Sequence, residues 1–363
     1  MRDIKINKIN IKIKIGNMVN KTERLEYLDA LRGFAMLLVV FVHVEIFGFF
    51  EFSHTTFLGK LFSAIHLPTF FFISGFCIYR PNATYGISHL YKDVLRLILP
   101  TFIVGIVYTY LVIHQDILYF LSNTMKAGYW FTISLFEILL IYRIVYCISK
   151  NRDRVLVALL VLIAVFLYLI KLPLKVIPQA ELIGNYLCLH QTCNYFLYFV
   201  IGILCSKYKG LVTRYLSNKL ISSFVLLVFG VISYLMFSYF SLVELSGVTG
   251  KIIETLGETL IGMSGVLLLY MLFFHNKSIF NNDNLLGKSL IIIGNNTLAI
   301  YLLHYFLLPN LPMVGDFFKN YPNILCELIL GLIISYIVII VSIIVARLIR
   351  ISPIIGKVLL GDK

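Results

Sequence analysis

Charged residues are scarce in this chain. Only 13% of its 363 residues are Asp, Glu, Lys or Arg, whereas 60% are hydrophobic and the mean hydropathy is +0.91. Soluble domains contain about 25% charged residues. The shortage argues against a soluble protein and indicates a chain embedded in a membrane.

The cysteines lack any metal-binding pattern. The six of them form no CxxC pair, and no Cys/His cluster has the spacing of a zinc site, so we predict no metal. Most are expected to be small apolar residues of helices. Cys188 and Cys193 lie near one end of a span, where a disulfide is the alternative.

A cleavable signal peptide and an extramembrane domain are also missing. The first apolar run is long, carries charges and has no small-residue cleavage site, so it should remain a membrane helix. Residues 1–24 alternate Ile with Lys and Asn without a partner strand, and we assign them no structure. Met18 is an alternative start. The expected organisation is a basic cytoplasmic segment over 1–24, a membrane domain over 25–350 and a cytoplasmic tail over 351–363.

Apolar runs separated by short polar breaks predict an all-α membrane bundle of about ten helices. The expected spans are 27–49, 57–79, 91–113, 130–149, 154–172, 191–206, 219–240, 252–274, 289–309 and 324–348. The sixth is short. Pro68 and Gly75 interrupt the second, which membrane helices tolerate when neighbours satisfy the freed backbone groups.

The loop charges fit this arrangement with both termini in the cytoplasm. Of the 31 Lys and Arg residues, 22 then fall on inside segments, six fall outside, and Arg32, Arg96 and Arg143 lie within spans. This bias follows the positive-inside rule. It explains the net charge of +13 without a nucleic-acid partner.

The first span, residues 27–50, contains ionisable groups, which are costly in a membrane and tend to mark functional interiors. Arg32 and His43 are eleven positions apart, or roughly 16 Å along a helix, so they should lie near one face and past the midplane. His43 is a candidate general base, with an interhelical hydrogen bond as the alternative. Asp29 can pair with Arg32 or cap the helix; otherwise Arg32 faces an anionic ligand. Glu45 should point to another face.

Further candidates occur on later helices. His66 should lie at a depth similar to that of His43, and Ser74 with Gly75 should permit close helix packing. Lys92 and Arg96, four apart at a cytoplasmic end, suit phosphate groups, with snorkelling as the alternative. The remaining candidates, each with a structural alternative, are the only tryptophan, Trp130 (an interfacial belt residue), Glu137, and His304 with Asn295, Asn296 and Thr297 (interhelical hydrogen bonds).

Several ordered segments resemble the acyltransferase 3 family of integral-membrane enzymes, which includes O-acetyltransferases of bacterial surface polysaccharides. The matching segments are Arg32 to His43, PTFFFISGF from Pro68, Trp130-Phe131, YFLYFVIGIL over 195–204, and TLAIYLLH over 297–304. One position departs from the family. Where it commonly has Arg-x-x-Arg before the third helix, Arg96 matches the second Arg, Asp93 occupies the first position, and Lys92 is the alternative cation.

The resemblance implies transfer of an acyl group, usually acetyl from acetyl-CoA, to a sugar hydroxyl in the bacterial cytoplasmic membrane. Lys92, Arg96 and Arg32 would hold the CoA phosphates, and His43 would deprotonate the acceptor, with no permanently bound cofactor. The partners would be acyl-CoA, a glycan or lipid-linked sugar, and the bilayer. One alternative is a non-enzymatic polysaccharide export protein on the same scaffold. Another, ion-coupled transport, lacks the internal repeats of many transporters.

Overall fold

The computed structural model describes residues 25–50, 56–81, 83, 85–150, 152–176, 178–216, 218–239 and 247–362. Within these ranges the chain is helical and no strand occurs. The segment 1–24 and the alternative start at Met18 lie outside the described residues. The predicted all-α class is confirmed.

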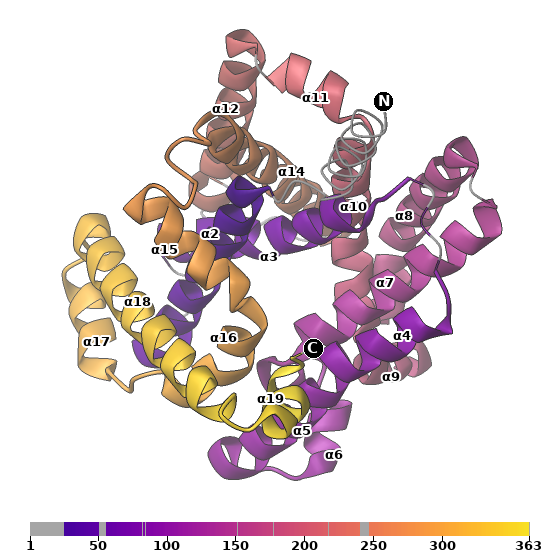
Figure 1. Ribbon diagram of the computed structural model, residues 1–363. Helices are drawn as coiled ribbons and strands as arrows, with labels where there is room; N and C mark the ends of the chain where they lie inside the picture. Colours follow the sequence, from indigo (N-terminus) through magenta and orange to yellow (C-terminus); the bar gives the residue numbers. More distant parts are fainter. Residues whose placement is uncertain are drawn as a thin grey trace, which may run out of the picture.

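The main helices follow one another with short connections (Figure 1). They are α2 (Glu26–His43), α3 (Phe57–Ile78), α4 (Ile87–Asp93), α5 (Leu99–Tyr108), α6 (Ile117–Ser122), α7 (Trp130–Ser149), α8 (Asp153–Val176), α9 (Pro178–Leu187), α10 (Leu189–Lys207), α11 (Lys209–Leu216), α12 (Lys219–Tyr234), α14 (Gly247–His275), α15 (Leu285–Asn295), α16 (Thr297–Leu303), α17 (Pro312–Asn320), α18 (Ile324–Ile349) and α19 (Pro353–Leu360). Four π-helical turns extend or join helices, at Val44–Gly48, Val94–Ile98, Thr109–Ile113 and Leu235–Tyr239. Two 3-10 turns, Lys126–Gly128 and His304–Leu307, complete the set.

The expected membrane spans are confirmed by the helix lengths. Eight described helices are long and apolar enough to cross a bilayer, and two bent pairs bring the number to ten if each pair is one span. The sixth span is such a pair, Glu181–Leu187 with Leu189–Lys207, bent by 64°, and is therefore longer than expected. The ninth, Leu285–Asn295 with Thr297–Leu307, bends by 66°. The cytoplasmic location of both termini stays a prediction.

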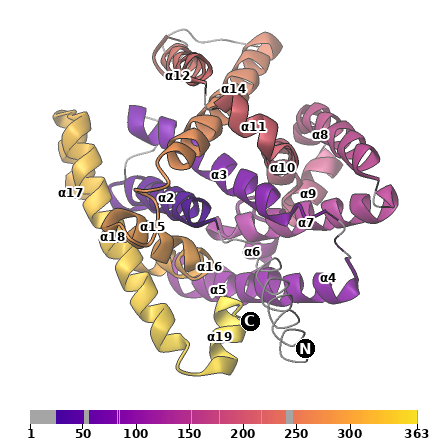
Figure 2. The same ribbon diagram turned by 45° about the horizontal axis from the view of Figure 1, so that its top comes forward.

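Helix α2 is the centre of the bundle, packed against α3, α14, α15 and α18 (Figures 1 and 2). Its crossing with α15 brings backbone against backbone, because a Cβ on Gly33 would lie 1.9 Å from the Leu290 carbonyl oxygen. The α3–α10 crossing is equally close, with a Cβ on Gly75 falling 2.0 Å from the Phe199 oxygen. Small residues permit such approach between membrane helices, so the expectation for Gly75 is confirmed.

The periphery is apolar. Helix α12 exposes Leu220, Phe224, Leu226 and Leu227, which soluble proteins would bury. In a bilayer these side chains contact lipid tails.

The six cysteines are all within the described residues and are free thiols, so the alternative of a disulfide between Cys188 and Cys193 is wrong; both are buried instead.

The chain end is also folded. Helix α19 lies beside α5 (Figure 2) and is the principal structure of the segment predicted as a tail. Arg350 donates to both carboxylate oxygens of Asp362, at 2.9 and 3.1 Å, and to the Asn296 side chain at 2.9 Å. The last residues are thereby fixed to the point where the ninth span bends.

Candidate active site

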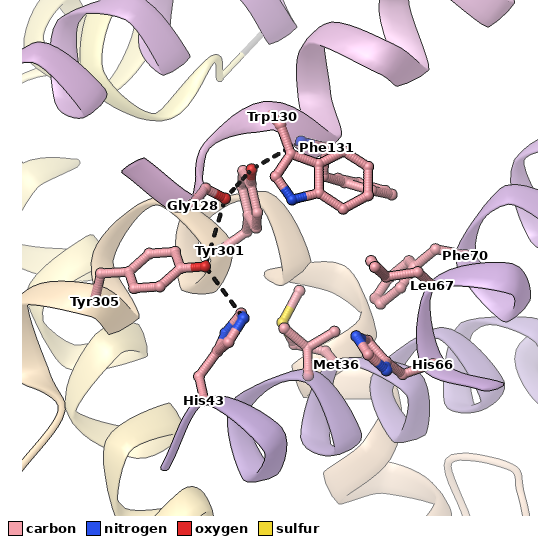
Figure 3. Close-up of a pocket in the computed structure, with 11 residues that line it drawn as sticks. Met36, His43, His66, Leu67, Phe70, Gly128, Trp130, Phe131, Tyr301 and Tyr305 are labelled. Carbon is pink, nitrogen blue, oxygen red and sulfur yellow. Dashed lines mark hydrogen bonds between the residues drawn. The ribbon is translucent and has the colours of Figure 1, made fainter. Parts of the chain in front are cut away.

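A small internal cavity of about 40 Å³ lies where α2, α3, α7 and the bent ninth span meet (Figure 3). It is lined by Met36, Val39, His43, His66, Leu67, Phe70, Gly128, Trp130, Phe131, Tyr301 and Tyr305. Three residues singled out from the sequence, His43, His66 and Trp130, are therefore neighbours around one space. The sequence places them more than 85 positions apart at the extremes.

His43 stands at the last position of α2, just before the π-helical turn Val44–Gly48. Its Nδ1 lies 2.9 Å from Nε2 of His304, and its Nε2 lies 3.1 Å from the hydroxyl of Tyr305. The His43 and His304 rings are nearly parallel, with centroids 5.1 Å apart and planes 16° apart. π-helical turns are frequent at functional sites because they break helical register locally.

The proton positions along this chain of contacts follow from one carbonyl group. Nδ1 of His304 lies 3.0 Å from the carbonyl oxygen of Ile300, which only accepts, so this nitrogen donates. In a neutral imidazole the other nitrogen then accepts, so Nε2 of His304 accepts a hydrogen bond from Nδ1 of His43. Nε2 of His43 is left as an acceptor for Tyr305. The basic nitrogen of His43 therefore faces the cavity.

His66 lies on the opposite side of the cavity, with Met36 between the two histidines (Figure 3). Its Nδ1 donates to the carbonyl oxygen of Phe62 at 2.6 Å, within its own helix. Its Nε2 remains as the second nitrogen of the ring. The cavity therefore presents two imidazoles from adjacent helices, held by different partners.

The roof of the cavity is the turn Lys126–Gly128 and the start of α7 (Figure 3). The Gly128 carbonyl accepts from the hydroxyl of Tyr301 at 3.0 Å, and at 3.4 Å from the Tyr305 hydroxyl it is an alternative acceptor to Nε2 of His43 for the single Tyr305 proton. The Lys126 ammonium, buried, donates to the carbonyl oxygens of Leu121 and Asn185. Burial lowers the pKa of Lys126. Left-handed φ angles at Lys126 and Ala127 are the kind of backbone strain that a well-determined surrounding structure maintains, whereas Gly128 adopts its positive φ readily.

The model of the acyltransferase domain of the acyltransferase 3 family matches residues 25–349. The chain belongs to this family. It is thus a membrane acyltransferase with a multi-pass helical fold. A search of curated proteins finds no match.

The acyltransferase has its cationic candidates away from the cavity. Arg32 lies 3.6 Å from the Asp29 carboxylate, so the expected local ion pair forms, and its guanidinium also contacts the Cys77 sulfur at 3.8 Å. Lys92 and Arg96 are exposed, and the π-helical turn Val94–Ile98 changes the helical register between them. Both stay available to an anion.

Asp93, the position that departs from the family pattern, makes an ion pair with Arg143 of α7. Both side chains are mostly buried, 18% and 13% exposed respectively, and the Arg143 guanidinium also lies 5.8 Å from the Tyr85 ring centre. An arginine at 93 would meet a second arginine. The acidic residue at this position is therefore matched to Arg143 in this chain.

Two other candidates, Ser74 and Glu137, lie outside the cavity, whereas Trp130 lines it. Ser74 donates to the Phe70 carbonyl of its own helix at 2.8 Å. Glu137 accepts from the Thr192 hydroxyl at 2.5 Å and so joins α7 to α10. Trp130 is only 6% exposed, stacks on Tyr195 and lines the cavity, and its depth in the membrane stays a prediction.

Sequence reasoning missed Tyr305, Tyr301 and the Lys126–Gly128 turn. A Tyr directly after His304 was the available signal for the first, since adjacent residues of a tight turn reach one site. Among the described residues no three His, Cys, Asp or Glu side chains come together to hold a metal ion. The imidazole and hydroxyl groups around the cavity are suited to proton transfer.

Proposed function

We propose that this acyltransferase moves an acetyl group from acetyl-CoA to a hydroxyl of a cell-envelope polysaccharide or its lipid-linked precursor. The observation that carries the proposal is the cavity in which His43 presents an unprotonated Nε2 (Figure 3). A base of this kind is what attack by a sugar hydroxyl on a thioester needs.

The transfer step follows from the contacts of His43. The acceptor hydroxyl takes the position of the Tyr305 hydroxyl beside Nε2, and Tyr305 turns to its second acceptor, the Gly128 carbonyl, 3.4 Å away. The hydroxyl proton moves to Nε2 as the acceptor oxygen bonds to the thioester carbon. The C–S bond then breaks, and the departing thiolate receives that proton. His43 returns to its starting form.

The size of the cavity supports acetyl as the group transferred. A water occupies about 10–15 Å³ on the same measure, so about 40 Å³ is room for only a few non-hydrogen atoms. Met36 and Phe70 are among its apolar lining residues. A two-carbon acyl group fits this space, and a long chain needs a different wall.

The protein would lie in the bacterial cytoplasmic membrane, and acetyl-CoA would approach it from the cytoplasmic side. Arg32, Lys92 and Arg96 are the cations proposed to hold CoA phosphates, because charge-assisted bonds to phosphate are among the strongest in proteins. The exposure of Lys92 and Arg96 and the half-exposed position of Arg32 support this role.

The test is an analysis of ester-linked acetyl in purified surface polysaccharide. Four strains are compared: wild type, a deletion, and the deletion complemented with His43→Ala or with His275→Ala at equal protein level. His275 is a helical histidine outside the cavity and is the matched control. Acetyl should be absent from the deletion and the His43→Ala strain and normal in the others. Equal acetyl in all four strains would overturn the proposal for that glycan.

A further inference from the structure

We infer that His304 is the positioning residue that makes His43 a base. It accepts a hydrogen bond from Nδ1 of His43, which keeps Nε2 of His43 free to take the proton of the sugar hydroxyl. This inference rests on the proposed function and deepens it. The role resembles that of an orienting carboxylate in other acid–base sites, but here a neutral imidazole performs it.

The first support is the direction of the hydrogen bonds, in which His43 donates to His304 and His304 donates to a backbone carbonyl. The Ile300 carbonyl accepts from Nδ1 of His304 at 3.0 Å, and Nε2 of His304 accepts from Nδ1 of His43 at 2.9 Å. The backbone carbonyl fixes the tautomer of both imidazole rings, because a carbonyl oxygen can only accept a hydrogen bond. His304 is fully buried, so bulk water does not compete for its nitrogens.

The second support is the course of the ninth span. A continuous helix from α15 would not turn at Asn296, yet the chain bends there by 66° and tightens into the 3-10 turn that starts at His304. The bend directs His304 and Tyr305 to the two nitrogens of His43. One short segment thereby contacts both sides of the same imidazole.

The consequence concerns the tautomer. Without an acceptor at Nδ1, the His43 ring can equally carry its proton on Nε2, and that form cannot take a proton from a substrate hydroxyl. After transfer, the His43 imidazolium has a proton on each nitrogen. Its Nδ1 proton still has His304 as acceptor, so the charged intermediate is hydrogen-bonded on the side away from the substrate.

Two amide substitutions separate this role from packing. In His304→Gln, the terminal amide reaches the place of Nε2 and can accept from His43. In His304→Asn, the shorter amide reaches the place of Nδ1 and can donate only to the Ile300 carbonyl. Both keep a polar buried side chain. Ser342→Ala on α18, a buried residue that bonds only to its own helix, is the control for mutation in the neighbouring core.

The experiment measures transfer of labelled acetyl from acetyl-CoA to polysaccharide in membrane vesicles, with each variant at equal folded amount by size-exclusion profile. We expect His304→Asn to lower kcat about 100-fold with KM for acetyl-CoA unchanged, since a positioned base is worth 10²–10⁴-fold. His304→Gln should restore most of the rate, and Ser342→Ala should match wild type. Equal rates for the Asn and Gln variants would overturn the inference.

The outcomes also keep this inference apart from the proposed function. If wild type transfers no acetyl, or His43→Ala transfers it normally, the proposed function fails, and the inference falls with it because there is no base for His304 to position. If wild type is active and His43→Ala is inactive, the function stands. The ratio of the Gln rate to the Asn rate then decides the role of His304 alone. Should both variants fail to fold, the same comparison is made with Tyr305→Phe, which leaves Nδ1 of His43 untouched and should retain more activity than His304→Leu.

Discussion

Replacing Gly33 with alanine should separate the two helices that bring the site together. The added Cβ would lie 1.9 Å from the Leu290 carbonyl oxygen, and about 1.1 Å of movement is needed to reach 3.0 Å. The obstacle is backbone, so no side-chain rotation removes it. Overpacking of this kind costs about 1–3 kcal/mol, partly offset by the better helix propensity of alanine.

The displacement should also reach the site. His43 is on the same helix as Gly33, and His304 lies in the second half of the bent span whose first half, α15, contacts Gly33. If half of the 1.1 Å movement is transmitted, the 2.9 Å contact between the imidazoles approaches 3.5 Å, where a hydrogen bond is weak. Acetyl transfer should therefore fall more than tenfold while the protein still folds.

Gly230→Ala is the matched control. Gly230 lies in α12, and a Cβ there meets nothing within 4 Å. Melting temperatures in detergent and acetyl transfer in vesicles are measured for both variants. We expect Gly33→Ala to melt about 2 °C or more below wild type, and Gly230→Ala to match wild type or melt slightly above it because alanine has the better helix propensity. Equal melting and equal activity of the two variants would refute the account of the α2–α15 crossing.

Three further predictions use other contacts. Met36→Ala should raise the rate with butyryl-CoA relative to acetyl-CoA severalfold, at a cost of about 2–5 kcal/mol in stability, and an unchanged ratio of the two rates would show that Met36 does not limit acyl length. Asp93→Arg should cost about 3–5 kcal/mol by placing two buried cations together; the double variant with Arg143→Asp should recover most of the melting temperature, and no recovery would contradict the pairing. Arg350→Lys should lose the two-pronged contact with the Asp362 side-chain carboxylate and about 1 kcal/mol, since the pair is one-third exposed, whereas Arg347→Lys, at an exposed position of α18, should not change the melting temperature.

The spans were predictable because each is a long apolar run whose signal is local. Pro68 inside α3 and the close contact at Gly75 also follow from local rules for membrane helices. His43 and His66 were expected at similar depth, and they line one cavity. In each case the sequence within a single helix, or two adjacent ones, contains the information.

The rest depends on contacts between distant segments. The bend at Asn296 lies inside an apolar run, where hydropathy gives no indication of a change in direction. Without that bend, His304 is one more histidine on a helix, and its partner 261 positions earlier is not identifiable. The partner of Asp93 was unpredictable for the same reason, since nothing in the sequence around Asp93 indicates a contact with Arg143 of α7.

The bend connects the two ends of the chain through one short segment. Arg350, just beyond the residues matched by the family, holds the Asn296 side chain at the start of the segment, and Asp362 in turn holds Arg350. At its other end the segment provides both partners of His43. The C-terminal residues thus help to fix the geometry around His43, the base proposed above. A loose C-terminal end would allow the bend to relax, and the cost would appear in the orientation of His43 before it appeared in the fold.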